Sequence, residues 1–210
     1  MRHVPSGSLE GLELGFDEGL AGALRPHAEY DVNRWLFVPD RYTEFRYLLG
    51  TRGARPLICV GINPSTARPD ALDRTLQSVE RIALRNGFDS FMMCNVSAER
   101  ATDPKAMARE MHPALRRENA RAFDWLLGQC AGPVVWAAWG SLIETRPYLL
   151  DCLRDLAEIG QKHGAEWVSF GPRSKKGHPH HPLYLRTDSE MEAFDIGQYL
   201  TEQVKANETR

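Results

Sequence analysis

Cysteine is scarce in this sequence, and no cysteine is arranged as a redox or metal site requires. The four cysteines of the 210-residue chain form no C-x-x-C pair. Cys59 and Cys94 lie in apolar runs, where a free cysteine behaves as a small hydrophobic residue. This distribution argues against a disulfide framework and against a cysteine-ligated cluster.

The sequence also lacks a strong excess of either charge and any long apolar run. The formal net charge is −2 at pH 7, which does not favour indiscriminate coating of nucleic acid. No segment reaches the length of a transmembrane helix, and the first residues lack the apolar centre of a secretory signal. We therefore expect a cytoplasmic protein with no membrane partner, and the sequence leaves its oligomeric state open.

No internal repeat or low-complexity linker divides the chain. Hydrophobic residues make up 42% of it, which is enough for one sizeable core. We expect a single α/β domain over residues 1–210, with an N-terminal extension over residues 1–30 and a polar C-terminal tail.

Continuous apolar runs alternate with segments of helical periodicity. Buried strands are predicted at 56–60, 91–96, 133–140 and 166–170, and two further strands at 35–38 and 45–49. Helices are predicted over 70–86, around 122–126, around 149–156 and around Met191, Phe194 and Leu200. Strands that are apolar throughout and alternate with helices predict a three-layer sandwich with a mostly parallel central sheet.

The most informative segment runs from Gly61 to Ala67 and reads Gly-Ile-Asn-Pro-Ser-Thr-Ala. Gly, Asn and Pro after a strand predict a sharp turn, and open α/β sheets place ligands at that end of a strand. The amide of Asn63 can orient a water or a substrate hydroxyl, but it cannot act as a strong base. The alternative is a structural turn in which Asn63 bonds its own backbone. Asp73 and Thr75 then begin the next helix, where we favour a capping role for Asp73 over a phosphate site.

Polar residues also follow the later strands. Arg100, in the polar run after Asn95, can bind a phosphate or carboxylate through two hydrogen bonds, or it can form a solvated pair with Glu99. Trp139 suits the core, and near a strand end it can also stack on a base. If the strands are parallel, these residues converge on one cleft at the carboxyl edge of the sheet.

The segment 173–184 is the one compact basic block, and it contains three cations and three histidines. Arg173, Lys175 and Lys176 suit anion recognition on a loop, and a histidine there can donate a hydrogen bond to a developing negative charge. No carboxylate or cysteine lies nearby at ligand spacing, so a metal site is disfavoured. The alternative is a solvated basic loop.

Three segments in combination resemble the bacterial family called domain of unknown function 1643. They are residues 61–67 with Asp73 and Thr75, residues 95–104, and Trp139-Gly140 together with Gly177 and residues 181–185. The likeness covers about residues 45–186, most of the chain, and it implies no settled activity.

A more distant likeness is to the uracil-DNA glycosylase superfamily. In its mismatch-specific branch the first motif reads Gly-Ile-Asn-Pro-Gly, and Gly61 to Pro64 match the first four of these residues. A second motif of the superfamily begins His-Pro or Asn-Pro, as His181-Pro182 does. The sequence departs from this pattern at Ser65, lacks a Ser after His181-Pro182 and lacks the cluster-binding cysteines of some branches. The resemblance implies a uracil-DNA-glycosylase-like α/β fold, an Asn63 that positions the attacking water and a His181 that supports the departing base.

The leading hypothesis is an N-glycosidic hydrolase that acts on a nucleobase-containing ligand, a nucleotide or a nucleic acid, without a cofactor or metal. Its catalytic residues would be Asn63 and His181. Its substrate-binding residues would be Gly61, Pro64, Ser65, Thr66, Asn95, Arg100, Trp139, Arg173, Lys175, Lys176 and Tyr184. The alternative is a non-catalytic nucleotide or nucleic-acid binding module with the same cleft. A metal-dependent phosphate-ester hydrolase is disfavoured because no paired-carboxylate motif is visible.

Overall fold

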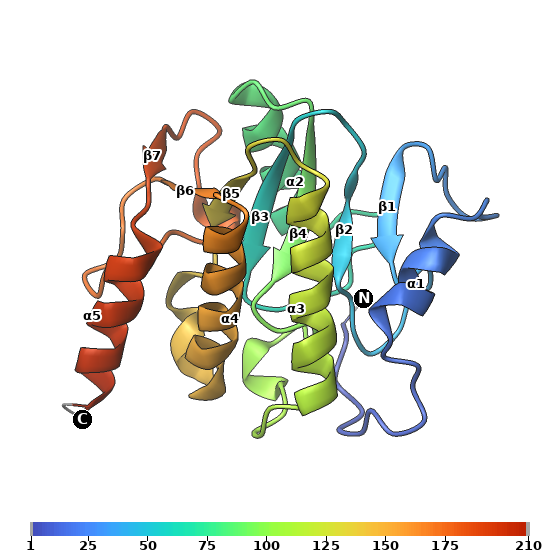
Figure 1. Cartoon of the computed structure of the whole chain (residues 1–210), viewed down its shortest axis with the longest axis horizontal. Coiled ribbons are helices and arrows are strands. Elements are labelled where there is room, and N and C mark those ends of the chain that lie inside the picture. The colour runs from blue at the N-terminus through green and yellow to red at the C-terminus, as the bar shows by residue number, and fades with distance from the viewer. Residues whose placement is uncertain (1, 209–210) are drawn as a thin grey trace.

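The computed structural model describes residues 2–208 and contains one seven-stranded sheet (Figure 1). In spatial order its strands are β1 (Trp35–Val38), β2 (Leu48–Thr51), β4 (Ser90–Asn95), β3 (Pro56–Gly61), β5 (Val134–Ala137), β6 (Glu166–Phe170) and β7 (Met191–Ala193). The four strands β4, β3, β5 and β6 are parallel.

The outer strands correct the prediction of a mostly parallel sheet. Strands β1, β2 and β7 pair antiparallel with their neighbours, so the sheet is mixed. A parallel neighbour requires a crossover connection, usually an α-helix. No α-helix joins β1 to β2 or β6 to β7, and the chain reverses direction in both places.

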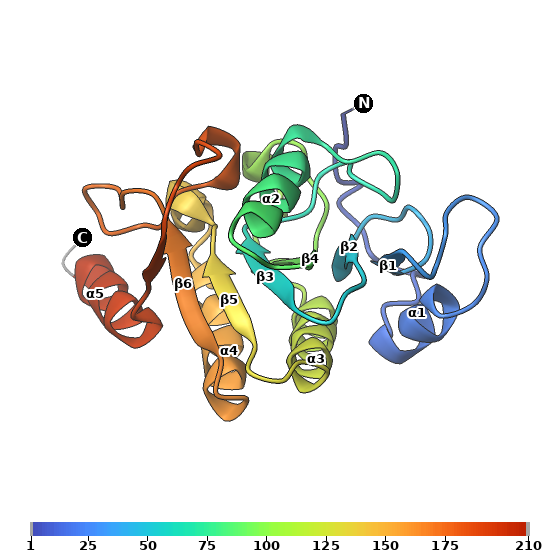
Figure 2. The ribbon, with the colours of Figure 1, turned by 90° about the horizontal axis from the view of Figure 1, so that it is seen from above.

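Helices flank the sheet on both faces, as predicted. Helix α2 (Arg74–Arg85) covers one face, and α1 (Phe16–Ala23), α3 (Pro113–Gly128) and α4 (Tyr148–Lys162) cover the other (Figure 2). Helix α5 (Ile196–Glu208) packs beside α4. One buried cluster lies on each face of the sheet. The finer prediction of a uracil-DNA-glycosylase-like three-layer arrangement stays a prediction. No helix among the described residues is long and apolar enough to cross a bilayer.

Several element boundaries differ from those expected. Strand β2 begins at Leu48, so Phe45 and Arg46 precede it. Met191 belongs to the edge strand β7 and Phe194 follows it, whereas both were expected in a closing helix. Helix α1 anchors the N-terminal extension through the buried Phe16. Helix α5 continues to Glu208 through the expected polar tail, of which residues 209–210 lie outside the described residues.

The order of the central strands produces the opening that holds the candidate site. Strands β3 and β5 are neighbours, paired from Leu57 with Val134 to Val60 with Ala137. The chain leaves β3 through α2 on one face, and it leaves β5 through α4 on the opposite face. Connections that diverge in this way leave a crevice at the carboxyl ends of the two strands.

Candidate functional site

A cleft of about 710 Å³ lies at the carboxyl ends of the parallel strands. Its size falls within the range typical of small-molecule sites. Asn63 and His181 both line it, although they are far apart in the sequence. Of the predicted site residues, the cleft is lined by Gly61, Asn63, Ser65, Thr66, His181 and Tyr184.

The amide of Asn63 is held in one orientation by the turn after β3. Its Nδ2 donates to Ala101 O at 2.8 Å and to Pro64 O at 3.0 Å. The turn is fixed to the loop after β4, because Ala101 N donates to Pro64 O at 2.9 Å. Asn63 does bond its own turn, and because both bonds use Nδ2, Oδ1 is the amide atom that remains as an acceptor for a further contact.

His181 enters the cleft as a neutral imidazole. It precedes a short 3₁₀ helix (Pro182–Tyr184), and its Nδ1 accepts a hydrogen bond from Leu183 N at 3.3 Å. Burial lowers the pKa of His181 below its usual 6.5, although Asp73 partly opposes this effect. Because Nδ1 accepts from Leu183 N, the proton of the neutral ring lies on Nε2, which has no hydrogen-bond partner among the described residues.

A hydrogen bond holds the His181 segment in place, and Gly140 approaches it closely. Ser78 Oγ, on helix α2, donates to Pro182 O at 2.9 Å. Gly140 has φ 62°, and a Cβ at that position would lie 3.3 Å from the Cβ of His181. The close approach and the left-handed backbone together favour glycine at residue 140.

Trp139 does not line the cleft. Its side chain is fully buried on the face of the sheet covered by α3 and α4, where it packs against Trp167 and Phe194. Its indole N–H donates to Tyr199 Oη at 3.1 Å, and that hydroxyl lies 2.8 Å from His178 Nδ1. His178 lines the cleft, so Trp139 supports the site through Tyr199 rather than by stacking on a base.

The three cations of the basic block also lie outside the cleft lining. Arg173 stacks on Phe194, with its guanidinium 4.7 Å from the ring centroid. Lys176 Nζ pairs with Glu144 at 2.8 Å, and Lys175 is exposed. The same loop instead turns its Ser174 and its histidines into the cleft.

Arg100, Asn95 and Pro64 are buried behind the cleft wall. Arg100 Nη1 donates to Ser65 O and, at 3.4 Å, to Ala67 O, so it supports the turn that carries Asn63. Asn95 lies beside Gly61, and its buried amide has no hydrogen-bond partner among the described residues.

Arg46 lines the cleft and was not predicted as a site residue. Its side chain is 1% exposed. Desolvation, and secondarily the charge of Arg100, lowers the pKa of Arg46 to about 9, whereas Asp73, Cys94 and Tyr42 oppose the shift. The sequence feature that could have identified Arg46 is its position inside the otherwise apolar run Phe45-Arg46-Tyr47-Leu48-Leu49.

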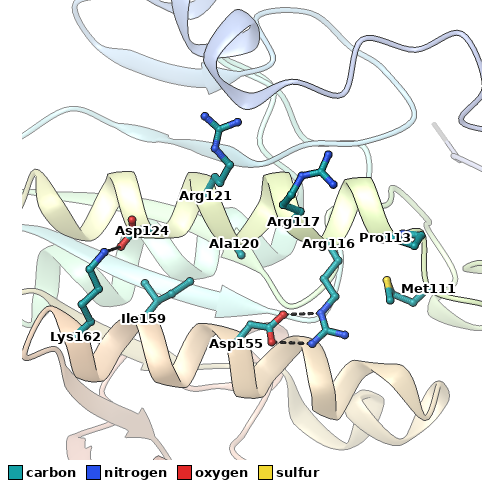
Figure 3. Close-up of a pocket in the computed structure, with 10 residues that line it drawn as sticks. All are labelled: Met111, Pro113, Arg116, Arg117, Ala120, Arg121, Asp124, Asp155, Ile159 and Lys162. Atoms are coloured by element: carbon teal, nitrogen blue, oxygen red, sulfur yellow. Dashed lines mark hydrogen bonds and ion pairs between the residues drawn. The ribbon is translucent and has the colours of Figure 1, made fainter.

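A second pocket lies between α3 and α4 (Figure 3), and each charged residue that lines it forms an ion pair. Arg116 Nη2 donates to Asp155 at 2.7 Å, and Lys162 Nζ pairs with Asp124 at 2.8 Å. Ala120 and Ile159 also line this pocket. The pocket is an apolar groove whose charged rim residues are ion-paired, and no reactive side chains converge in it. The described residues include no cluster of His, Cys, Asp and Glu suited to a metal ion.

Comparison with known proteins places the chain in a family. No curated protein and no solved structure matches it. The sequence profile described as "Protein of unknown function (DUF1643)" matches residues 46–183, which include the Asn63 turn, Arg46, Arg100 and His181. The match covers more than half of the 210 residues. The chain therefore belongs to the DUF1643 family.

Proposed function

We propose that the cleft hydrolyses the N-glycosidic bond of a nucleobase-containing ligand. The observation that carries the proposal is the joint presence of the Asn63 amide and the neutral His181 imidazole in one cleft. The two groups come from the turn after β3 and the loop after β6. They also occupy the positions at which the sequence resembles the uracil-DNA glycosylase superfamily.

The two groups suit a reaction in which the base leaves before water attacks. The C1′–N bond breaks, and the bonding electron pair leaves with the base. His181 Nε2–H donates a hydrogen bond to the resulting base anion, an interaction that strengthens as negative charge develops. Asn63 Oδ1 accepts a hydrogen bond from the water and orients it towards the anomeric carbon.

An amide cannot take the water's proton as a strong base, so bond cleavage must run ahead of water attack. The proton passes to the departed base or to solvent once the new C–O bond forms. Asp73 lines the same cleft, and a carboxylate there favours the positive charge that builds up on the sugar. Its side chain also caps α2 by accepting from Leu76 N at 3.0 Å, which confirms the capping role we favoured.

The test is release of free base, measured by chromatography. Substrates are single- and double-stranded oligonucleotides that contain uracil or hypoxanthine, and the corresponding nucleoside 5′-monophosphates. A base within a duplex must first be flipped out of the stack. We expect release by the wild-type protein and a loss of at least about 100-fold in rate for Asn63→Ala and for His181→Ala.

Matched controls separate chemistry from folding. Asn33→Ala removes an exposed amide, and His27→Ala removes an imidazole whose Nδ1 accepts from the N–H two residues later, as that of His181 does. Both controls should retain wild-type rates. Wild-type protein that releases no base from any substrate would overturn the proposal. Binding of these compounds without release would instead support the non-catalytic binding module.

A further inference from the structure

Two buried arginines beside the cleft have no carboxylate partner among residues 2–208. Arg46 and Arg100 are 1% and 0% exposed, and among the described residues neither forms an ion pair. Both donate through Nη1 to the same oxygen, Ala67 O, at 3.2 and 3.4 Å. The two positive charges are therefore close together inside the protein. Arg46 Nε and Arg100 Nε and Nη2 remain without a hydrogen-bond partner in the described chain.

This arrangement is unfavourable in the absence of a ligand. A buried charge is costly unless it is paired and its donors are satisfied. The arginines of α3 show the usual solution, since Arg116 forms two hydrogen bonds to the carboxylate of Asp155. The cost of burying the charge of Arg46 is offset only in part, by the hydrogen bond to Ala67 O and by the charge of the nearby Asp73. Arg100 is partly compensated by Tyr42, whose ring centroid lies 4.2 Å from its guanidinium. An anion that enters the cleft would pair with Arg46, because Arg46 lines it.

The groups around Arg46 suit a phosphate. The first turn of α2 lines the same cleft through Arg74 and Thr75, and the first N–H groups of a helix lack partners within the helix and attract anions. The hydroxyls of Ser65 and Thr66 line it as well. A guanidinium can donate two parallel hydrogen bonds to phosphate oxygens, and Arg46 lines the cleft with only one of its nitrogens, Nη1, in a hydrogen bond within the described chain.

We infer that Arg46, with Arg100 behind it, binds a terminal phosphate, so that the cleft takes a free nucleotide. This inference rests on the proposed function for the nucleobase part of the ligand. An internal phosphodiester is a poorer match, because the strand would have to continue on both sides of a nearly inaccessible guanidinium. The cations that could follow a strand, Arg173, Lys175 and Lys176, do not line the cleft. The net charge of −2 also provides no excess of positive charge for a strand.

The test compares ligands that differ by one phosphate, using isothermal titration calorimetry on the full chain. The probes are the four common nucleosides, their 5′-monophosphates, inorganic phosphate and oligonucleotides without terminal phosphates. We expect at least one monophosphate to bind at least tenfold more tightly than its nucleoside, and inorganic phosphate to compete with it. Oligonucleotides with internal phosphodiesters alone should bind more weakly than the monophosphate.

Variants locate the phosphate contact. Arg46→Met should abolish the preference for the monophosphate, and Arg46→Lys should retain the charge but lose most of the preference, since a lysine lacks the planar fork. Arg85→Met, an exposed arginine at the far end of α2, is the matched control and should bind as the wild type does. Thermal unfolding of each variant verifies that it folds.

Three results would overturn the inference: equal binding of nucleoside and monophosphate, tighter binding of the oligonucleotides, or an Arg46→Met variant that keeps the preference. The wild-type comparison decides the question even if Arg46→Met does not fold. Phosphate-dependent binding without base release would refute the proposed hydrolysis and leave this inference intact. Base release at a rate that does not depend on Arg46 would support the proposed hydrolysis and refute this inference.

Discussion

Replacing Arg46 with methionine should raise the stability of the protein without its ligand. Burial lowers the pKa of Arg46 from 12.5 to about 9. At about 1.4 kcal/mol per pKa unit, this corresponds to up to roughly 5 kcal/mol for holding the charge inside the protein at pH 7. The variant loses the hydrogen bond to Ala67 O, which contributes about 1.5–3 kcal/mol for a charged donor. Methionine keeps the apolar stem, so we expect the free energy of unfolding to rise by roughly 2 kcal/mol.

Urea unfolding followed by tryptophan fluorescence, at pH 7 in phosphate-free buffer, measures this change. The exposed control Arg85→Met should stay within about 0.5 kcal/mol of the wild type. A nucleoside monophosphate at 100 times its wild-type Kd should stabilise the wild type by about 2.7 kcal/mol and Arg46→Met by no more than about 1.4 kcal/mol, since the affinity of the variant falls at least tenfold. A loss of stability in Arg46→Met without ligand would refute the reasoning, because it would mean that the guanidinium is already satisfied by the folded chain.

Four further outcomes follow from the site. Because burial lowers the pKa of Arg46 to about 9, affinity for a nucleoside monophosphate should fall towards that for the nucleoside as the pH rises, as calorimetry with both ligands at pH 7.5 to 10.5 would detect. Because the pKa of His181 is lowered in the folded protein, the unfolded chain binds more protons than the folded one as the pH falls through 6.5, and the free energy of unfolding should fall on acidification. His181→Gln should reduce that fall, as urea titrations at pH 5 and 7.5 would show. Gly140→Ala should cost about 1–3 kcal/mol in the same assay, since residue 140 has φ 62°. Tyr199→Phe breaks the hydrogen bond to His178 and should lower the rate of base release while the variant remains folded, as circular dichroism would verify.

The centre of the fold could be predicted from the sequence because its strands are buried on both faces. A continuous apolar run such as 56–60 or 134–138 has one stable environment in an α/β protein, the interior of a parallel sheet. The edge strand β7 has no such signal. Met191–Ala193 is exposed throughout and becomes a strand through backbone pairing with Val168 to Phe170. The helical expectation for Met191 and Phe194 relied on their spacing, which a short strand and the start of a loop also satisfy.

The candidate site could be predicted at the level of segments and not of side chains. The turn at Asn63 and the loop at His181 follow parallel strands, and this placement brings them to one cleft. Which way each loop residue points depends on partners elsewhere in the sequence. Lys176 points away because Glu144 pairs with it, and Trp139 points away because Tyr199 accepts its N–H. Arg46 was not predicted as a site residue because an arginine in a strand-like run is ordinarily assigned to the solvent-exposed face of the strand.

The cleft combines groups that are already ordered with one charge that is not balanced. Asn63 and His181 are fixed by bonds to Ala101 O and from Leu183 N, so the groups that the proposed reaction uses are oriented by the protein itself. Arg46 is different, because Ala67 O and Asp73 offset its burial cost only in part and the inferred phosphate would offset more of it. Phosphate binding would offset a penalty that the free protein already carries, and the gain would appear as affinity for the phosphate rather than as acceleration of bond cleavage. The phosphate should therefore change KM strongly and kcat weakly, whereas Asn63 and His181 should act mainly on kcat.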